Sequence, residues 1–105
     1  MSNTSLEKIG YFNTILDPYN GITIESKDLP IDTQTFETNL DFLIDSVKNK
    51  RNLIWIYIDI KKSDFIPIAT NKGFVFHSCG EKYILVVKKL RADCVIPTAS
   101  NHTLG

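Results

Sequence analysis

His77 and Cys79 are the residues whose types and spacing come closest to a catalytic arrangement in this sequence. A thiolate activated by a neighbouring imidazole is a common nucleophile, and residues i and i+2 of a strand share one face. The surrounding sequence indicates neither a third residue to orient the imidazole nor donors for an oxyanion. We therefore interpret both as structural residues near a turn, and we predict no catalytic residue in this chain.

Metal and cofactor sites are not indicated either. The second histidine, His102, is distant in sequence, and Cys79 and Cys94 lack the spacing of a zinc site or a disulfide framework. The five glycines are isolated, so no dinucleotide-binding or phosphate-binding loop is present. We predict that the chain binds no metal and no cofactor, and that both cysteines are reduced thiols.

Aromatic rings and basic side chains interleave along the chain, a composition that would suit stacking on single-stranded nucleic acid. The net charge is zero, however, and most rings lie among Ile and Val, where burial in a core is the usual outcome. We therefore favour a core role for these rings over nucleic-acid binding. They are Phe12, Tyr19, Trp55, Tyr57, Phe65, Phe74, Phe76 and Tyr83.

Charge is divided unevenly between the two parts of the chain. Residues 1–45 carry eight acidic and two basic residues, whereas residues 46–105 carry ten basic and four acidic ones. If the two parts pack together, the basic runs can face either the acidic part or an anionic ligand, and charge alone does not decide. The runs are Lys48, Lys50, Arg51, Lys61 and Lys62, followed by Lys88, Lys89 and Arg91.

Length and composition are those of one soluble domain. A chain of 105 residues with 43% hydrophobic residues can form a single core without metals or disulfides. No window is long and apolar enough to cross a membrane, and residues 1–10 are polar rather than a signal peptide. We therefore expect a soluble, cytoplasmic protein with no membrane partner.

The elements that position these residues alternate between strands and helices. Apolar residues alternate over residues 21–26, which predicts a half-buried strand. A helix is predicted to begin at a cap, Asp32 or Thr33, and to bury Phe36, Leu40, Leu43, Ile44 and Val47. Residues 53–60 are β-branched and aromatic on both faces, which predicts a central strand covered on two sides with Trp55 in the core.

The last elements are predicted to be a short helix and a hairpin. Ser63 or Asp64 opens the helix, and Gly73 ends it. Residues 74–78 and 82–90 are predicted to form two strands joined by a short turn. The predicted fold class is α+β, with a mixed, mostly antiparallel sheet and two helices. One domain is expected over residues 1–95, and residues 96–105 are expected to begin a linker.

Four blocks of sequence, in this order and spacing, resemble a known family. They are Ile54-Trp55-Ile56, residues 65–77 (FIPIATNKGFVFH), residues 83–90 and residues 97–105 (PTASNHTLG). Together they resemble the N-terminal domain that precedes the catalytic module in one subgroup of Nudix hydrolases. This subgroup contains the plant Nudix enzymes and the vertebrate product of the basic fibroblast growth factor antisense gene.

The resemblance implies a fold like part of an acetyltransferase (GNAT) and a role without catalysis. The family's catalytic residues are a cluster of magnesium-binding glutamates, whereas Glu7, Glu25, Glu37 and Glu81 are scattered here. The glycine-rich loop that holds coenzyme A in acetyltransferases is also missing, so an acetyltransferase-like enzyme is the least favoured of the hypotheses for its function. The chain itself is therefore expected to be inactive.

The parent enzyme implied by the resemblance uses Mg or Mn to hydrolyse nucleoside diphosphates linked to another moiety, such as ADP-ribose or NADH. In this reading, residues 96–105 lead into a Nudix catalytic module that this chain lacks. The expected partners are that module, a second copy of the chain, or both, and the expected role is in dimerisation or in shaping the substrate pocket. The alternative is a free-standing module that binds proteins or small ligands.

Overall fold

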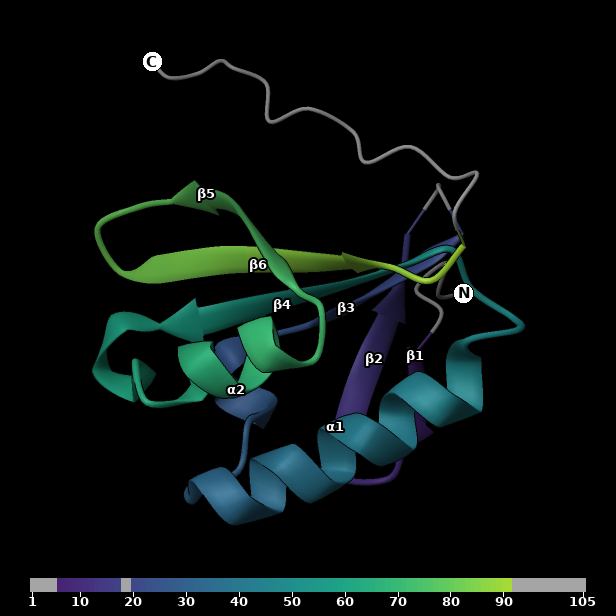
Figure 1. Cartoon of the computed structure of the whole chain (residues 1–105), viewed down its shortest axis with the longest axis horizontal. Helices are drawn as coiled ribbons and strands as arrows, with labels where there is room; N and C mark the ends of the chain where they lie inside the picture. The colour runs from purple at the N-terminus through teal and green to yellow at the C-terminus, as the bar shows by residue number, and fades with distance from the viewer. Residues whose placement is uncertain (1–5, 18–19, 92–105) are drawn as a thin grey trace.

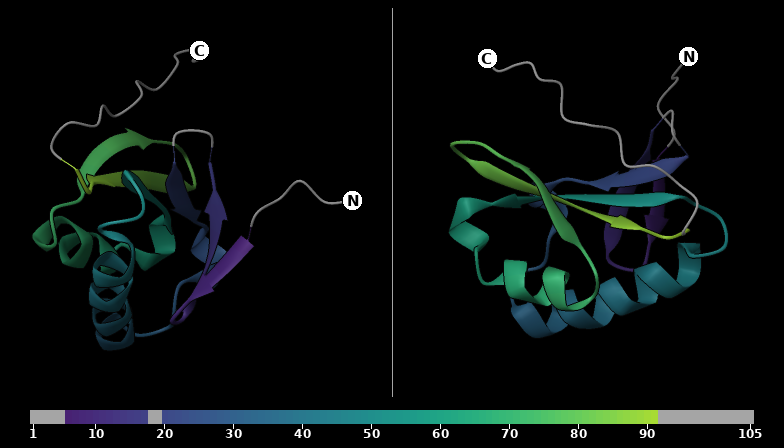
Figure 2. Two further views of the ribbon diagram at one scale, coloured as in Figure 1. Left: turned by 90° about the vertical axis from the view of Figure 1, so that its right-hand side faces the viewer. Right: turned by 45° about the horizontal axis from the view of Figure 1, so that its top comes forward.

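The computed structural model of the chain describes residues 6–17 and 20–91. In these ranges six strands form one sheet, and two helices lie together on one of its faces (Figure 1 and Figure 2). The order across the sheet is β1-β2-β3-β4-β6-β5. None of the helices in the described ranges is long and apolar enough to cross a membrane.

The sheet is mixed because one connection between neighbouring strands is a helical crossover. β3 and β4 are parallel, with the longer helix between them in the chain, and all other neighbours are antiparallel. This confirms the predicted α+β class with two helices. The strands are β1 (Leu6–Ile9), β2 (Phe12–Leu16), β3 (Gly21–Ile24), β4 (Leu53–Asp59), β5 (Val75–Cys79) and β6 (Tyr83–Lys89). The helices are α1 (Thr33–Val47) and α2 (Phe65–Asn71), with short 3-10 turns η1 (Ser26–Asp28) and η2 (Ile60–Lys62).

The hairpin of β1 and β2 is absent from the predicted order, which began with the strand at 21–26. Gly10 makes its tight turn possible, because its φ of 58° is one that side-chain-bearing residues rarely adopt. Phe12 and Thr14 of β2 are both fully buried. A buried threonine in a polar stretch breaks the apolar alternation, which is why periodicity did not indicate this strand.

Helix α1 begins where its cap was predicted. The carboxylate of Asp32 accepts hydrogen bonds from the backbone N–H and the hydroxyl of Thr35, both at 2.8 Å. These bonds, the backbone one first, lower the pKa of Asp32 below its ordinary value of 3.8. The buried face of the helix carries Phe36, Leu40, Leu43 and Val47, as the spacing predicted, whereas the fifth predicted residue, Ile44, is only partly buried at the edge of the core.

Helix α2 packs against α1 under the same face of the sheet. Phe65 stacks on Phe36 with ring centroids 4.6 Å apart. Lys72, just after α2, donates to Asp41 of α1 at 2.7 Å. Gly73 has a φ of 99° and follows the helix, which confirms its predicted role at the end.

Strand β4 is central, but only one of its faces is covered by helices. Ile54, Ile56 and Ile58 are fully buried toward α1 and α2. Trp55 is only half-buried and Tyr57 is 39% exposed on the opposite face. The prediction of a strand covered on both faces, with Trp55 in the core, is therefore wrong. Both described helices lie on the same side of the sheet, which leaves the odd-numbered positions of β4 facing away from them.

Candidate functional site

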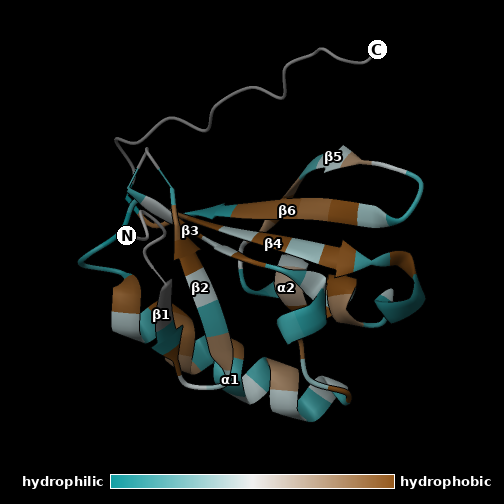
Figure 3. Cartoon of the chain, turned by 180° about the vertical axis from the view of Figure 1, so that it is seen from behind, coloured by the Kyte–Doolittle hydropathy of each residue, from teal (hydrophilic) through white to brown (hydrophobic). Residues whose placement is uncertain are grey.

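The sheet face turned away from α1 and α2 is the candidate functional site, and we call it the open face. Strand register places one row of its side chains across five strands: Ile15, Thr23, Trp55, Val87 and Val75. A second row holds Tyr57 beside Leu85. Hydrophobic residues continue along β4 and β6 (Figure 3). The open face is thus an apolar surface with polar rims, and no described helix covers it.

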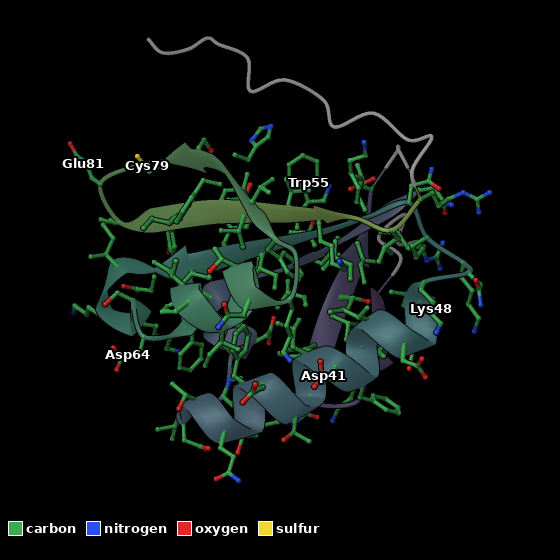
Figure 4. The ribbon with its side chains drawn as sticks, in the orientation of Figure 1. Asp41, Lys48, Trp55, Asp64, Cys79 and Glu81 are labelled. Carbon is green, nitrogen blue, oxygen red and sulfur yellow. The ribbon has the colours of Figure 1, made fainter. Side chains whose placement is uncertain are left out.

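Trp55 and His77 meet on this face. Their ring centroids are 4.9 Å apart and their planes lie at 85°, an edge-to-face contact between β4 and β5 across the intervening strand β6. Figure 4 shows Trp55 on the side of the sheet that faces away from the helices. The contact holds the edge strand against the centre of the sheet.

Tyr57 and Tyr83 form a second aromatic pair at the other end of the face. Their centroids are 6.2 Å apart with planes at 80°, and the rings are 39% and 46% exposed. A cavity of about 480 Å³ lies on the hairpin side of the pair and one of about 350 Å³ on the η1 side. The first is lined also by Leu85 and residues 78–82, the second by residues 25–27. The tyrosine pair therefore forms a ridge between two hollows.

His77 and Cys79 do not keep the simple geometry that a regular strand would give them. The register with β6 shifts between Phe76 and Ser78, so the alternation of faces is broken between His77 and Cys79. Cys79 is exposed near the hairpin tip (Figure 4). The packing of His77 against Trp55 supports the structural interpretation of the histidine.

The described residues contain no group of three or more His, Cys, Asp or Glu that could hold a metal ion. The glutamates with described side chains lie on separate elements: Glu25 beside η1, Glu37 on α1 and Glu81 in the β5–β6 turn. Cys94 and His102 lie outside the described residues. Nothing in these ranges resembles a clustered carboxylate site.

The basic side chains do not all contact one group, and their partners lie in different parts of the fold. Lys72 contacts Asp41 and Glu37, which joins a basic residue to the acidic part of the chain. Lys62 donates to the backbone oxygens of Ser26 and Leu29 at 3.3 and 3.5 Å. Lys48 pairs with Asp45 within the same helix end. Among these contacts, Lys72 joins the two parts of the chain through side-chain ion pairs, and Lys62 joins them through backbone oxygens.

Aromatic rings divide between the core and the open face, so the expectation that most are core residues holds only in part. Phe12, Phe65 and Phe74 are buried, whereas Tyr57 and Tyr83 are exposed. Phe76 is also exposed, and Tyr19 lies outside the described residues. The signal for the open face was present in residues 53–59, where isoleucines alternate with a tryptophan and a tyrosine. Rings with a polar atom suit a half-exposed position.

Comparison with known proteins identifies the family. Residues 12–90 match the family model described as the Nudix hydrolase domain. The chain is 22% identical over 92 residues to Nudix hydrolase 8 of Arabidopsis thaliana; the match covers 85% of this chain and 25% of the plant protein. The chain thus spans about a quarter of the length of that relative. The predicted resemblance is confirmed, and the chain belongs to the Nudix hydrolase domain family.

Proposed function

We propose that this chain is a non-catalytic N-terminal accessory domain of a Nudix hydrolase, and that its open face packs against the catalytic module of the same protein. The observation that carries the proposal is the half-exposed aromatic and aliphatic surface around Trp55, on the face that no described helix covers. Family membership and the quarter-length match to a relative named as a hydrolase support the choice of partner.

The composition of the open face suits a protein interface. Trp55, Tyr57 and Tyr83 are the residue types that supply most binding energy at interfaces, since they bury large areas with little loss of side-chain entropy. Leu85, which is half-buried beside Tyr57, adds an aliphatic side chain, and charged residues at the edges of the face would form a polar rim. A surface of this kind is best kept from water by a partner.

The accessory role would be to hold the catalytic module and shape its substrate pocket. Under this proposal the domain ends near residue 95, residues 96–105 begin the linker, and the catalytic module supplies the glutamates that bind Mg or Mn. The reaction would be the hydrolysis of a nucleoside diphosphate linked to another moiety. A cytoplasmic location and a likeness to part of an acetyltransferase fold stay predictions.

A free-standing ligand-binding module is the second candidate, because two hollows flank the Tyr57–Tyr83 pair. A ridge of rings between two cavities can hold a planar ligand. Each cavity wall carries one acidic and one basic residue, Glu25 with Lys27 and Glu81 with Lys82. This balance of charge selects no class of ligand, so the docking proposal is preferred.

The proposal is tested by binding between this chain and the Nudix catalytic module, prepared as separate polypeptides and mixed in a calorimeter. We expect a one-to-one complex that Tyr83→Glu weakens by about tenfold or more. Phe76→Glu is the matched control, because Phe76 is also an exposed ring but pairs in register with core residue Val86 rather than with the open face. An equal loss for both variants would contradict docking through the open face. Formation of a dimer of this chain in place of the complex would favour a second copy as the partner.

A further inference from the structure

The chain contains a single Asn-Gly sequence, Asn20–Gly21, at the point where β3 begins. In such a pair the backbone nitrogen of the glycine can attack the side-chain amide of the asparagine, because glycine carries no Cβ to hinder its approach. Asn20 is exposed to solvent and has a φ of 60°, in the left-handed region that residues with side chains rarely adopt. The sequence is therefore chemically reactive, and the fold decides whether it reacts.

Hydrogen bonds hold both polar atoms of the peptide group between Asn20 and Gly21. The N–H of Gly21 donates to Oδ1 of Asp17 at 2.9 Å, and the carbonyl of Asn20 accepts from the N–H of Asn52 at 2.9 Å. Attack requires the glycine nitrogen to lose its proton and to move onto Cγ of Asn20, which rotates the peptide group. This rotation breaks both bonds, and the carboxylate of Asp17 also opposes a negative charge on the nitrogen.

The side-chain amide of Asn20 is held at both of its polar atoms too. Its Nδ2 donates to the carbonyl of Lys50 at 3.1 Å, and its Oδ1 accepts from Nη1 of Arg51 at 3.0 Å. The contact with Arg51 by itself favours the reaction, since a cation stabilises the oxyanion that forms on Oδ1. The barrier in the folded chain therefore lies at the attacking nitrogen, in the bond from Gly21 to Asp17.

We propose that Asn20 is a site of spontaneous deamidation, which the folded chain keeps closed and which reacts when the start of β3 opens. The deprotonated nitrogen of Gly21 bonds to Cγ of Asn20, and Nδ2 takes a proton from water and leaves as ammonia. Water then opens the cyclic imide at either carbonyl, which gives aspartate or isoaspartate at residue 20. The inference is independent of the docking proposal, because it rests on the turn before β3 and not on the rings of the open face.

The modification would convert a brief opening into a lasting change of the sheet. Gly21 pairs with Leu53 at the first position of the β3–β4 register, directly after the carbonyl that Asn52 contacts. Isoaspartate adds one carbon to the main chain between residues 20 and 21, which shifts Gly21 relative to that carbonyl. Aspartate keeps the main chain but loses the Nδ2 donor to Lys50. The isoaspartate product is therefore expected to melt at a lower temperature than the unmodified chain.

The test measures deamidation at Asn20 by peptide mapping and mass spectrometry, in the folded chain and in the chain unfolded in urea. Asn49, which is exposed and followed by Lys50, is the internal control. In urea we expect Asn20 to react faster than Asn49, since its attacking nitrogen belongs to a glycine. In the folded chain Asn20 should react at least about tenfold more slowly than in urea, because the reaction needs an opened segment. Equal rates at Asn20 in both states, or equal rates at the two asparagines in urea, would overturn the proposal.

Asp17→Ala tests the barrier itself. Loss of the acceptor for the Gly21 N–H should raise the rate at Asn20 in the folded chain several-fold. Asp45→Ala is the matched control, because it removes an exposed carboxylate that pairs with Lys48, and it should leave the rate unchanged. Thermal melting verifies that each variant is folded. An unchanged rate in folded Asp17→Ala, or an equal rise in both variants, would contradict the role of Asp17.

Hydrogen exchange at the Gly21 amide gives a measurement that needs no variant. Exchange and deamidation both require this N–H to leave the carboxylate of Asp17. At urea concentrations below the unfolding transition, the two rates should therefore rise together. A deamidation rate that stays constant at Asn20 while exchange at Gly21 accelerates would refute the proposal.

Discussion

The rings of Trp55 and His77 meet edge to face at 4.9 Å although 22 positions separate them in sequence. This contact explains two features of the molecule. It covers part of an indole that no helix covers, so Trp55 is half-buried rather than exposed. It also packs the imidazole, whose position near Cys79 first suggested chemistry, against the indole. The histidine is better understood as part of the open face than as a base.

The packing of α1 on α2 is predicted to depend on the stacked pair Phe36 and Phe65. Phe36→Leu and Phe65→Leu should each lower the free energy of unfolding by about 1 kcal/mol or more. Because the rings are in contact, the double variant should show a coupling energy of about 0.5–1.5 kcal/mol. Urea unfolding measures all three variants. Phe76→Leu, at a 62% exposed position, is the control, and equal coupling of Phe36 to Phe76 would refute the assignment.

Gly21 is predicted to be required by the parallel pairing of β3 with β4. A Cβ at this position would lie 2.8 Å from Oδ2 of Asp17 and 3.1 Å from the backbone oxygen of Leu53. Gly21→Ala should therefore destabilise the domain by about 1–3 kcal/mol. Gly80→Ala meets nothing closer than 3.8 Å and should change stability by less than about 0.5 kcal/mol. Thermal or urea unfolding distinguishes the two, and similar values for both would contradict the close approach.

The cap of α1 is predicted to make stability depend on pH in the acidic range. Hydrogen bonds from Thr35 lower the pKa of Asp32 in the folded state, so the folded protein binds the proton less readily than the unfolded chain. The stability that the ionised Asp32 contributes is complete above its ordinary pKa of 3.8, and it is lost as the pH falls through the lower pKa of the folded state. Asp32→Asn keeps a capping side chain but removes the titration. Unfolding curves at a series of pH values should show that this variant loses less stability in acid than the unaltered chain does. An identical pH dependence for the two proteins would count against the cap.

The isolated chain is predicted to hydrolyse neither ADP-ribose, NADH nor nucleoside triphosphates in the presence of Mg or Mn. The reason is chemical: the glutamates with described side chains lie on different elements and could not share a metal-bound diphosphate. Chromatography of the nucleotide products, such as AMP, after incubation of each substrate with the purified chain measures this. Turnover that depends on the metal and remains with the chain through successive purification steps would refute the non-catalytic role.

Elements with strong local signals could be predicted from the sequence, and those held by distant contacts could not. Helix α1 has a cap at Asp32 and an apolar face of regular spacing, and its predicted start was confirmed. In the β1–β2 hairpin the apolar residues do not alternate regularly, because a polar residue, Thr14, holds a fully buried position of β2. The open face escaped prediction because Trp55 and Tyr57, which alternate with the isoleucines of β4, are large rings of a kind that a core also holds. Such a run does not reveal which face the helices cover.

The claim that the open face docks on a Nudix catalytic module is tested most directly by side-chain footprinting. Hydroxyl-radical labelling of this chain, alone and with the separately prepared module, reports the solvent access of individual rings by mass spectrometry. We predict that labelling of Trp55, Tyr57 and Tyr83 falls when the module binds, while Phe76 and Phe42 stay as reactive as before. Unchanged labelling of the three open-face rings in a proven complex, or protection confined to Phe76 and Phe42, would contradict the proposal.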